Sequence, residues 1–427
     1  MRIVRSETET ETETETETET ETETETETET ETETETGQAA WQRYHASVAF
    51  DLRDWLPEFP IREHCLYLDH AAVCPLPRPV AEAMRKRIAD QERTGLDNSE
   101  EWRNNHLTCR HLGSQLIGCG PEDISIVRST SEGLSMVAEG LGWKKADQVL
   151  VGEEEFAANA APWLHLARKG VKVVRYPQVD GRVDPDQIAR NLTSKTRLVT
   201  VSWVAFHTGW IAPLAEIGRI CRDHGCLLVV DAIQGLGVLP MDMRAIGIDA
   251  VVADGHKWLL GPEGAGLMAT TPELRGQLQP VLSGWRNVHR QPGDFFLDRL
   301  AFVEDGRRFE PGARNGVGVA GLAAGLDIIA SVERETIQSR VETLARMLTR
   351  ILIAHGWDVF SPGSGQPVAG IVAARPRGTT AREAHRRLSE RRVVCAVRQG
   401  LVRFSPHFYI TRGELEALDR ILEKVGL

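Results

Sequence analysis

Short apolar runs alternate with amphipathic stretches from about Tyr67 to the C-terminus, and this alternation constrains the fold more than any other feature. Apolar runs of strand length separated by helix-length segments are typical of an α/β fold with a largely parallel sheet. Residues 214–223, followed by His224 and Gly225, fit a helix that a glycine ends between two such strands. The predicted strands are residues 148–151, 171–176, 198–202, 226–230 and 250–253.

The 427 residues of the chain divide into four predicted parts. Residues 1–37 form a Glu/Thr tail and residues 38–64 an N-terminal segment. A large domain that contains the sheet spans residues 65–311, and a smaller α/β domain spans residues 312–427. Within the smaller domain, residues 318–356 are predicted to form mostly one long helix, with short β and α segments after it. A chain of this length suffices for one large globular unit of two subdomains.

The tail contains fifteen Glu-Thr pairs, residues 7–36, and no apolar residue. It has nothing to bury, so we expect it to be disordered. A strand is disfavoured despite the strict alternation, because like charges on one edge repel and neither face is apolar. Removing these glutamates changes the formal net charge from −11 to +4, so the folded part is nearly neutral. It has no basic patch that would indicate a nucleic-acid partner.

The N-terminal residues lack the apolar core of a signal sequence, and no later apolar stretch is long enough to span a bilayer without charges. The sequence therefore predicts a cytoplasmic protein with no membrane partner. Its seven cysteines are an odd number without a Cys-x-x-Cys pair, which argues against a disulfide framework and a zinc ribbon. We expect most of them to be small buried side chains, and we expect no metal site.

Two apolar strands that end in polar side chains form the most informative region. Residues 227–230 lead into Asp231, and residues 250–253 lead toward Lys257. Open α/β sheets bind ligands at the carboxyl ends of their strands, so we expect both side chains to face one crevice. A lysine amine binds the aldehyde of pyridoxal 5'-phosphate (PLP) as a Schiff base, and a carboxylate opposite the ring nitrogen keeps that nitrogen protonated. Taken singly, Asp231 could cap a helix and Lys257 could be a surface lysine, but the combination favours PLP.

Residues 129–133, Ser-Thr-Ser-Glu-Gly, precede a helical run over residues 134–141. Hydroxyl groups and free backbone N–H groups at a helix N-terminus bind phosphate well. The alternative is a plain capping box of Ser129 with Glu132, which occurs on many helices that bind nothing. This segment is therefore informative only together with Asp231 and Lys257.

These pieces together resemble one known family. The series Thr130-Ser-Glu, Asp231-Ala-Ile-Gln, Gly255-His-Lys and Phe309-Glu-Pro-Gly resembles the class V aminotransferases, which include the cysteine desulfurases and belong to the PLP fold type I enzymes. The resemblance runs in the right order from about Tyr67 to the C-terminus. It implies a large PLP-binding domain with a mostly parallel sheet flanked by helices and a smaller C-terminal α/β domain. It also implies a homodimer and a small-molecule substrate that is an amino acid.

The resemblance assigns roles to individual residues. Lys257 forms the Schiff base, and Asp231 pairs with the pyridine nitrogen. Arg403 matches the family arginine that grips the substrate α-carboxylate, a task suited to a planar bidentate donor. The other implied cofactor contacts are Gln234 at the ring hydroxyl, Phe156 on the ring face, and Thr130, Ser131, Glu132 and His256 at the phosphate. Two alternatives stay open, because Arg403 could be a strand arginine in an ion pair and Phe156 a core phenylalanine.

The chain also departs from the desulfurase pattern at several positions. Asp254 stands where many relatives have serine, Ala313 where they often have threonine or serine, and Phe206 where they usually have asparagine. The cysteine nearest to the expected loop or motif, Cys395, lies in the apolar run 393–398 and lacks the neighbouring histidines of that motif. A buried structural thiol fits this setting, which disfavours a desulfurase that forms a persulfide on the enzyme.

The sequence thus favours an aminotransferase-type reaction on an amino acid, with Lys257 as the general base at Cα. A C–S lyase, whether like cysteine desulfurase or like selenocysteine lyase, and an amino-acid epimerase are the alternatives. A dehydrogenase is disfavoured, because the Gly-x-Gly-x-x-Gly match at residues 316–321 enters a long helix instead of following a strand, and close packing of small residues explains it better. A non-catalytic binding module would have to explain why Lys257, Asp231 and Gln234 all remain.

Overall fold

The structure is a computed structural model that describes residues 50–290, 296–363 and 365–427. Contacts divide the chain into two units, Met1–Phe50 and Asp51–Leu427, and all elements named below belong to the second. The predicted tail and residues 38–49 lie outside the described residues. The predicted domain boundaries stay predictions.

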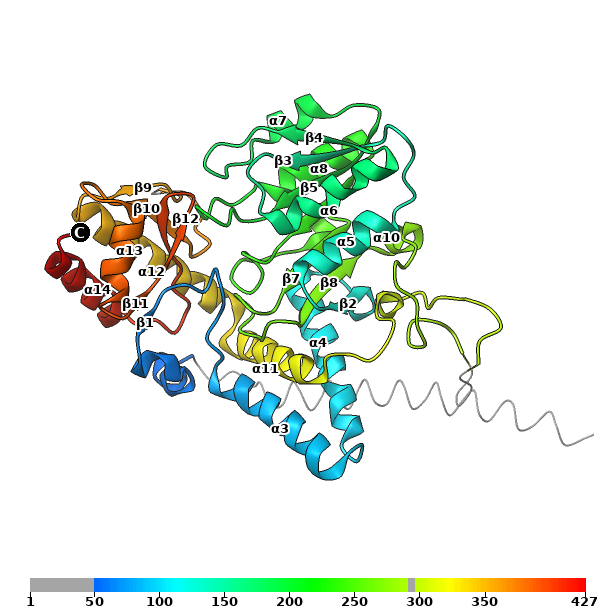
Figure 1. Ribbon diagram of the computed structural model, residues 1–427, viewed down its shortest axis with the longest axis horizontal. Helices are drawn as coiled ribbons and strands as arrows, with labels where there is room; N and C mark the ends of the chain where they lie inside the picture. Colours follow the sequence, from blue (N-terminus) through cyan, green and yellow to red (C-terminus); the bar gives the residue numbers. More distant parts are fainter. Residues whose placement is uncertain (1–49, 291–295, 364) are drawn as a thin grey trace, which may run out of the picture. The chain divides into compact units, whose positions relative to one another are not determined.

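A seven-stranded sheet forms the centre of the larger α/β part (Figure 1). Strands β3 to β7 are parallel, whereas β8 is antiparallel to both of its neighbours. In their order across the sheet, the strands are β2 (Ile124–Val127), β8 (Gly266–Thr270), β7 (Ala250–Asp254), β6 (Leu227–Asp231), β5 (Thr196–Ser202), β3 (Gln148–Gly152) and β4 (Lys172–Tyr176). The five predicted strands are confirmed to within two residues at either end.

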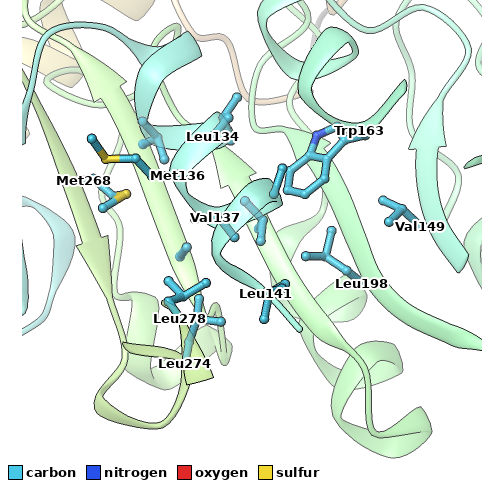
Figure 2. Packing of buried hydrophobic residues seen from close by; sticks show 14 of the residues in the cluster. Leu134, Met136, Val137, Leu141, Val149, Trp163, Leu198, Met268, Leu274 and Leu278 are labelled. Carbon is cyan, nitrogen blue, oxygen red and sulfur yellow. The ribbon is translucent and has the colours of Figure 1, made fainter. Parts of the chain in front are cut away.

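The central strands are almost continuously apolar because both faces of the sheet are buried. Figure 2 shows one face, where Leu134 and Trp163 from two helices pack over the strand residues Val149 and Leu198. Leu150, which points to the opposite face from Val149, is also fully buried. The α/β class predicted from the sequence is therefore confirmed.

The helices connect and cover the strands. In chain order they are α2 (Leu52–Trp55), α3 (Arg78–Thr94), α4 (Ser99–Ile117), α5 (Thr130–Gly140), α6 (Ala161–His165), α7 (Pro185–Asn191), α8 (Leu214–His224), α9 (Met243–Ile246), α10 (Pro272–Gln277), α11 (Gly316–Val332), α12 (Arg334–Ala354), α13 (Ala381–Ser389) and α14 (Arg412–Val425). Helix α8 was predicted, and it ends at Gly225, whose φ of 76° is easily adopted only by glycine.

The C-terminal region forms a separate four-stranded antiparallel sheet (Figure 1, orange and red). Its strands are β12 (Ala396–Arg398), β13 (Leu401–Phe404), β10 (Val372–Arg375) and β9 (Asp358–Val359), in this order. Gln399 and Gly400, both with positive φ, form the two-residue turn between β12 and β13. The register pairs Arg398 with Leu401 and Ala396 with Arg403, so both arginines lie on one face of the hairpin.

The described N-terminal segment packs against this C-terminal region. Strand β1 (Leu66–Tyr67) pairs in parallel with β11 (Val393–Val394). Upstream of β1, the ring of Phe59 stacks on Tyr409 with 3.7 Å between centroids. Residues far apart in the sequence are thereby joined just before the chain enters the larger sheet.

The prediction of one long helix over residues 318–356 is wrong. Two helices, α11 and α12, meet there at an angle of 84°. Between them lies Glu333, whose φ of 66° is incompatible with a continuous right-handed helix. Helix α11 packs against α3 and α4, whereas α12 contacts β9 and β10 of the smaller sheet. Helix α11 is apolar on almost all sides and α12 is amphipathic, but no glycine or proline stands at the break, which is why the sequence alone suggests a single helix.

The glycines of the Gly-x-Gly-x-x-Gly match lie at the start of α11 and serve packing. A Cβ atom added at Gly321 would lie 2.9 Å from the side chain of Met84 on α3. The interpretation as close packing of small residues is confirmed. Among the described residues, no single helix is long and apolar enough to cross a membrane, and only the bent pair α11 and α12 reaches the required length and composition together.

Candidate active site

A cavity of about 350 Å³ opens at the carboxyl ends of β6 and β7. This is the edge at which open α/β sheets bind ligands, and the volume is within the range of small-molecule sites. All predicted site residues except Glu132 line it: Thr130, Ser131, Phe156, Asp231, Gln234, His256, Lys257 and Arg403. The structure thus brings together side chains that are up to 273 positions apart in the sequence.

Asp231 ends strand β6 and is almost fully buried. Its Oδ1 atom accepts a hydrogen bond from the backbone N–H of Ile233 at 3.1 Å, which fixes the carboxyl group. Burial raises the pKa of Asp231 to about 7, and the nearby Glu155 adds to this, while Lys257 opposes it. A cationic group placed against Asp231 would restore the carboxylate form, as the pyridinium nitrogen of PLP would.

Lys257 follows β7, the parallel neighbour of β6. Burial lowers the pKa of its amine to about 8, although the carboxyl group of Asp231 opposes this shift. The Nζ atom lies 5.8 Å from the ring centroid of Phe156. With a pKa of about 8, about a tenth of Lys257 is the neutral amine at pH 7, far more than for an exposed lysine, and the neutral amine is the form that attacks an aldehyde.

The side-chain amide of Gln234 is held from both ends. Its Nε2 donates to the backbone oxygen of Ala71 at 2.9 Å, and its Oε1 accepts from the indole N–H of Trp258 at 3.0 Å. These partners determine the orientation of the amide and leave one Nε2 hydrogen unused. Gln234 can therefore donate to an oxygen in the cavity, such as a ring hydroxyl.

The N-terminus of α5 forms another wall of the cavity. Ser129 caps this helix by accepting from the N–H of Glu132. The Oγ1 atom of Thr130 accepts from the backbone N–H of Asp254 at 3.1 Å, so the hydroxyl hydrogen of Thr130 remains available to a ligand. The backbone N–H groups of Thr130 and Ser131, at the first turn of the helix, have no acceptor within it. These donors suit an anion such as phosphate.

Glu132 points away from this wall. Its carboxylate accepts from the backbone N–H of Arg128 at 2.6 Å and forms an ion pair with the guanidinium of the same residue. Arg128 thus holds the carboxylate of Glu132 outside the cavity, and any contact of this residue with a phosphate would come from its backbone. The capping interpretation holds for Ser129, while anion binding by the segment 130–132 stays a prediction.

Asp254 and His256 line the cavity together on the β7 side. Asp254 is buried, and its Oδ2 lies 3.1 Å from Nδ1 of His256. The two groups are close, but the geometry is not that of a hydrogen bond, since Nδ1 of His256 has no hydrogen-bond partner among the described residues. The Oδ1 atom of Asp254 has no hydrogen-bond partner in the described part of the chain.

Arg403 is both a strand arginine in an ion pair and a cavity residue. It lies on β13 with only 1% of its surface exposed. Its Nη2 donates to Oδ1 of Asp69 at 2.9 Å, and its Nη1 donates to the backbone oxygen of Phe206 at 2.7 Å. Burial raises the pKa of Asp69, and Arg403 counteracts this by stabilising the carboxylate. The guanidinium is therefore fixed before any substrate arrives.

The sequence interpretation missed a second arginine in the cavity, Arg398. Its Nη1 donates to the backbone oxygen of Val397 at 2.9 Å, and among the described residues Arg398 forms no ion pair with an acid. Arg398 directly precedes the Gln-Gly turn and Arg403 is the third residue after it, a spacing that puts both side chains on one face of a two-residue hairpin and could have identified the pair. The cavity thus offers more guanidinium donors than one arginine supplies.

The residues that depart from the desulfurase pattern lie in different places. Phe206 does face the cavity, where its ring meets that of Phe156 edge to face at 5.1 Å. Ala313 lies in another cavity, together with Leu282 and Arg314. Cys395 is buried and does not line the cavity, and burial raises the pKa of its thiol. The structure therefore confirms the expectation that Cys395 is a buried thiol.

The seven-stranded sheet, with a lysine and a carboxylate at the ends of adjacent parallel strands, defines an α/β enzyme of the PLP fold type I class. The family model for class V aminotransferases matches residues 66–418. The chain belongs to the class V aminotransferase family. The family resemblance, the enzyme class and PLP as the cofactor, all predicted from the sequence, are confirmed by this assignment.

Individual relatives agree with this assignment. A probable cysteine desulfurase of Methanothermobacter thermautotrophicus is 30% identical over 391 residues, which are 86% of this chain and 96% of that protein. The isopenicillin N epimerase of Streptomyces clavuligerus is 28% identical over 329 residues, 73% of this chain and 82% of that protein. The apo structure of a cysteine desulfurase from Thermococcus onnurineus NA1 has a TM-score of 0.81 and 26% identity, and covers 89% of this chain and 99% of that one.

The pKa values in the cavity predict how the protein captures PLP. Lys257 has a pKa of about 8, so the rate of capture by cofactor-free protein should rise as the pH rises through 8 and level off above it. The carboxylate of Asp231 favours the ammonium form, so Asp231→Asn should lower the pKa of Lys257 and move the curve to lower pH. The measurement is the growth of the PLP absorbance band after mixing at each pH. Asp223→Asn, an exposed carboxylate on α8, is the control, and a curve that moves to higher pH in Asp231→Asn would contradict the assignment.

Proposed function

We propose that this protein is a PLP-dependent enzyme that transfers the amino group of an amino acid, with Lys257 holding the cofactor and acting as the base at Cα. The observation that carries this proposal is the placement of Lys257 and Asp231 at the ends of adjacent parallel strands, facing one cavity. Burial lowers the pKa of Lys257 to about 8, which suits a base near neutral pH, while Asp231 would be a carboxylate against a cationic ring nitrogen.

The side chains present fit PLP. When bound, PLP supplies the electron sink that labilises the bonds at Cα. Asp231 would face the ring nitrogen, and the remaining amide hydrogen of Gln234 would face the ring hydroxyl. Thr130, Ser131 and His256 would bind the phosphate. Phe156 would cover one face of the ring.

For the substrate α-carboxylate we propose Arg403, as the family resemblance implies, together with Arg398. Asp69 and the backbone oxygen of Phe206 already use two donors of Arg403, and this fixes the plane of its guanidinium. Arg398 lies on the same face of the hairpin and supplies further donors. Two guanidinium groups attract a carboxylate more strongly than one that is already paired with an acid.

A C–S lyase is the second candidate, and the names of several relatives favour it, including the probable cysteine desulfurase. The burial of Cys395 argues against a mechanism in which this thiol receives the substrate sulfur. A lyase of this kind would therefore release sulfur without a carrier at Cys395. Epimerisation is the third possibility and uses the same proton transfer at Cα.

We also propose a homodimer in the cytoplasm. Between residues 281 and 300, several large apolar side chains are exposed, among them Leu282, Trp285 and Leu300. A concentration of exposed apolar and aromatic side chains is typical of an interface. All seven cysteines are free, as in proteins of reducing compartments.

Oligomeric state can be measured directly. Light scattering should give a mass of two chains, and Leu300→Asp should shift the protein toward the mass of one, because a carboxylate would be placed in an apolar contact. Leu164→Asp, at an exposed leucine on α6, serves as the matched control. A wild-type protein with the mass of a single chain at micromolar concentration would contradict the proposal.

The proposed role of Lys257 predicts colour. The protein purified with PLP should be yellow, and borohydride should fix the cofactor covalently and bleach the band. Lys257→Ala should lose the covalent fixation and about a thousandfold or more of the activity, because both the Schiff base and the general base are removed. Lys424→Ala, at an exposed lysine of α14, should change neither. A colourless wild-type protein that does not react with PLP would contradict the proposal.

The reaction type can be read from products. Amino acids incubated with the holoenzyme should yield keto acid if the first candidate is right, sulfide from cysteine if the lyase is right, and the opposite enantiomer for an epimerase. Cys395→Ala should leave every product rate within about twofold, since burial keeps this thiol from acting as a nucleophile. If the substitution abolished sulfide release, the case against a persulfide on Cys395 would fail.

A further inference from the structure

A second cavity of about 360 Å³ adjoins the first. Phe206 lines both cavities. Residues adjacent in the sequence line different cavities: Phe156 and Arg398 line the first, whereas Glu155 and Gln399 line the second. The second cavity therefore begins where Phe206 closes the first. We call it the acidic recess, and its polar lining comes chiefly from Glu153, Glu154, Asp180, His207 and Arg375.

The acids of the recess come from the carboxyl ends of two adjacent strands. Glu153 and Glu154 follow β3, and Asp180 lies in the segment after β4, its parallel neighbour. In the described part of the chain, no lysine or arginine forms an ion pair with any of these three carboxylates. Their negative charge is thus left without an internal cation, and it is directed at the space beside the proposed active site.

The other charged groups nearby offset these acids only in part, since one arginine faces three carboxylates. Arg375 is exposed and places its guanidinium over the ring of Phe360, 4.8 Å from the centroid. The carboxyl group of Glu155 is turned to Ser202 and Asn159, which donate hydrogen bonds to it. Glu153, Glu154 and Asp180 therefore determine the charge of the recess.

His207 gives a second indication that the recess receives a ligand. Its side chain is more than nine-tenths buried, and its Nε2 lies 3.6 Å from the carboxylate of Glu154. The Nδ1 atom has no hydrogen-bond partner in the described residues. Burial lowers the pKa of His207, so the ring is neutral at pH 7 and offers an acceptor. The carboxylate of Glu154 also accepts a hydrogen bond from the backbone N–H of Gly181. A buried acceptor beside carboxylates that lack a lysine or arginine partner suits a ligand that donates hydrogen bonds.

We propose that the acidic recess binds the cationic end of the substrate side chain, an ammonium or guanidinium group, and so selects basic amino acids. The inference rests on the proposed function, because it takes the substrate Cα to lie at Lys257. Phe206 lines both cavities, its ring meets that of Phe156 in the first, and these two rings suit the methylene groups of such a side chain. Arg398 and Arg403 lie at the carboxylate end, so the charges of the site match a basic amino acid at both ends.

Isosteric ligands test this inference. The PLP-loaded enzyme is titrated with lysine and with norleucine, which lacks only the ammonium group, and with arginine and citrulline, which differ in the charge of the end group. The half-saturation concentration is read from the change in PLP absorbance, so binding is measured even without turnover. Lysine and arginine should bind at least about tenfold more tightly than their neutral counterparts, the effect of roughly one charge-assisted hydrogen bond.

Substitutions locate the effect in the recess. Glu154→Gln and Asp180→Asn should each reduce the preference for lysine over norleucine by about tenfold and leave norleucine binding within about twofold. Glu216→Gln, at an exposed glutamate of α8, is the matched control and should keep the preference. An unchanged PLP spectrum before ligand is added shows that each variant is folded and loaded.

The possible failures are distinct. If the wild-type protein gives no PLP spectrum, the proposed function fails. If the spectrum is normal and lysine and norleucine bind equally, the recess does not select basic amino acids, while the proposed function stands. A lysine preference that survives both Glu154→Gln and Asp180→Asn also overturns the role of the recess.

Discussion

The parallel pairing of β6 with β7 is the constraint on which the rest of the site depends. It places a carboxyl group and an amine in one buried crevice, where neither can keep its charge as it would in water. Burial raises the pKa of Asp231 and lowers that of Lys257, and each opposes the shift of the other. The result is two groups whose protonation states lie close in free energy. A base at Cα needs an amine that loses its proton more easily than an exposed lysine does, and burial at the end of β7 provides this for Lys257.

The surrounding contacts keep this pair in a fixed frame. Trp258 and the backbone of Ala71 orient Gln234, and Asp69 orients Arg403. Ala71 and Asp69 belong to the stretch after β1, which itself pairs with the C-terminal region through β11. The cavity wall is therefore made of early, central and late parts of the chain. A substitution that weakens the pairing of β1 with β11 should therefore displace Gln234 and Arg403, although it changes neither residue.

The sequence predicts the parts of the structure that depend on local pattern. Five strands, helix α8 and the Lys257–Asp231 pair follow from apolar runs that end in polar residues. The break at Glu333 was missed because a single positive φ leaves the helical period intact. The position of the Glu132 carboxylate could not be predicted because it depends on its contacts with Arg128. The role of Arg398 was missed because it depends on strand register, which a sequence of short strands specifies poorly.

The hairpin of β12 and β13 sets a rule for how this site can change. Arg398 lines one cavity and Gln399, the first residue of the turn, lines the next. Successive side chains of a strand point to opposite faces. Adding or removing a single residue before the turn would therefore turn the side chain of Arg398 from the first cavity to the acidic recess. Insertions of two residues would preserve the alternation. Variants of this hairpin that keep the arginine in one cavity and the carboxylates in the other should therefore differ in length by an even number of residues.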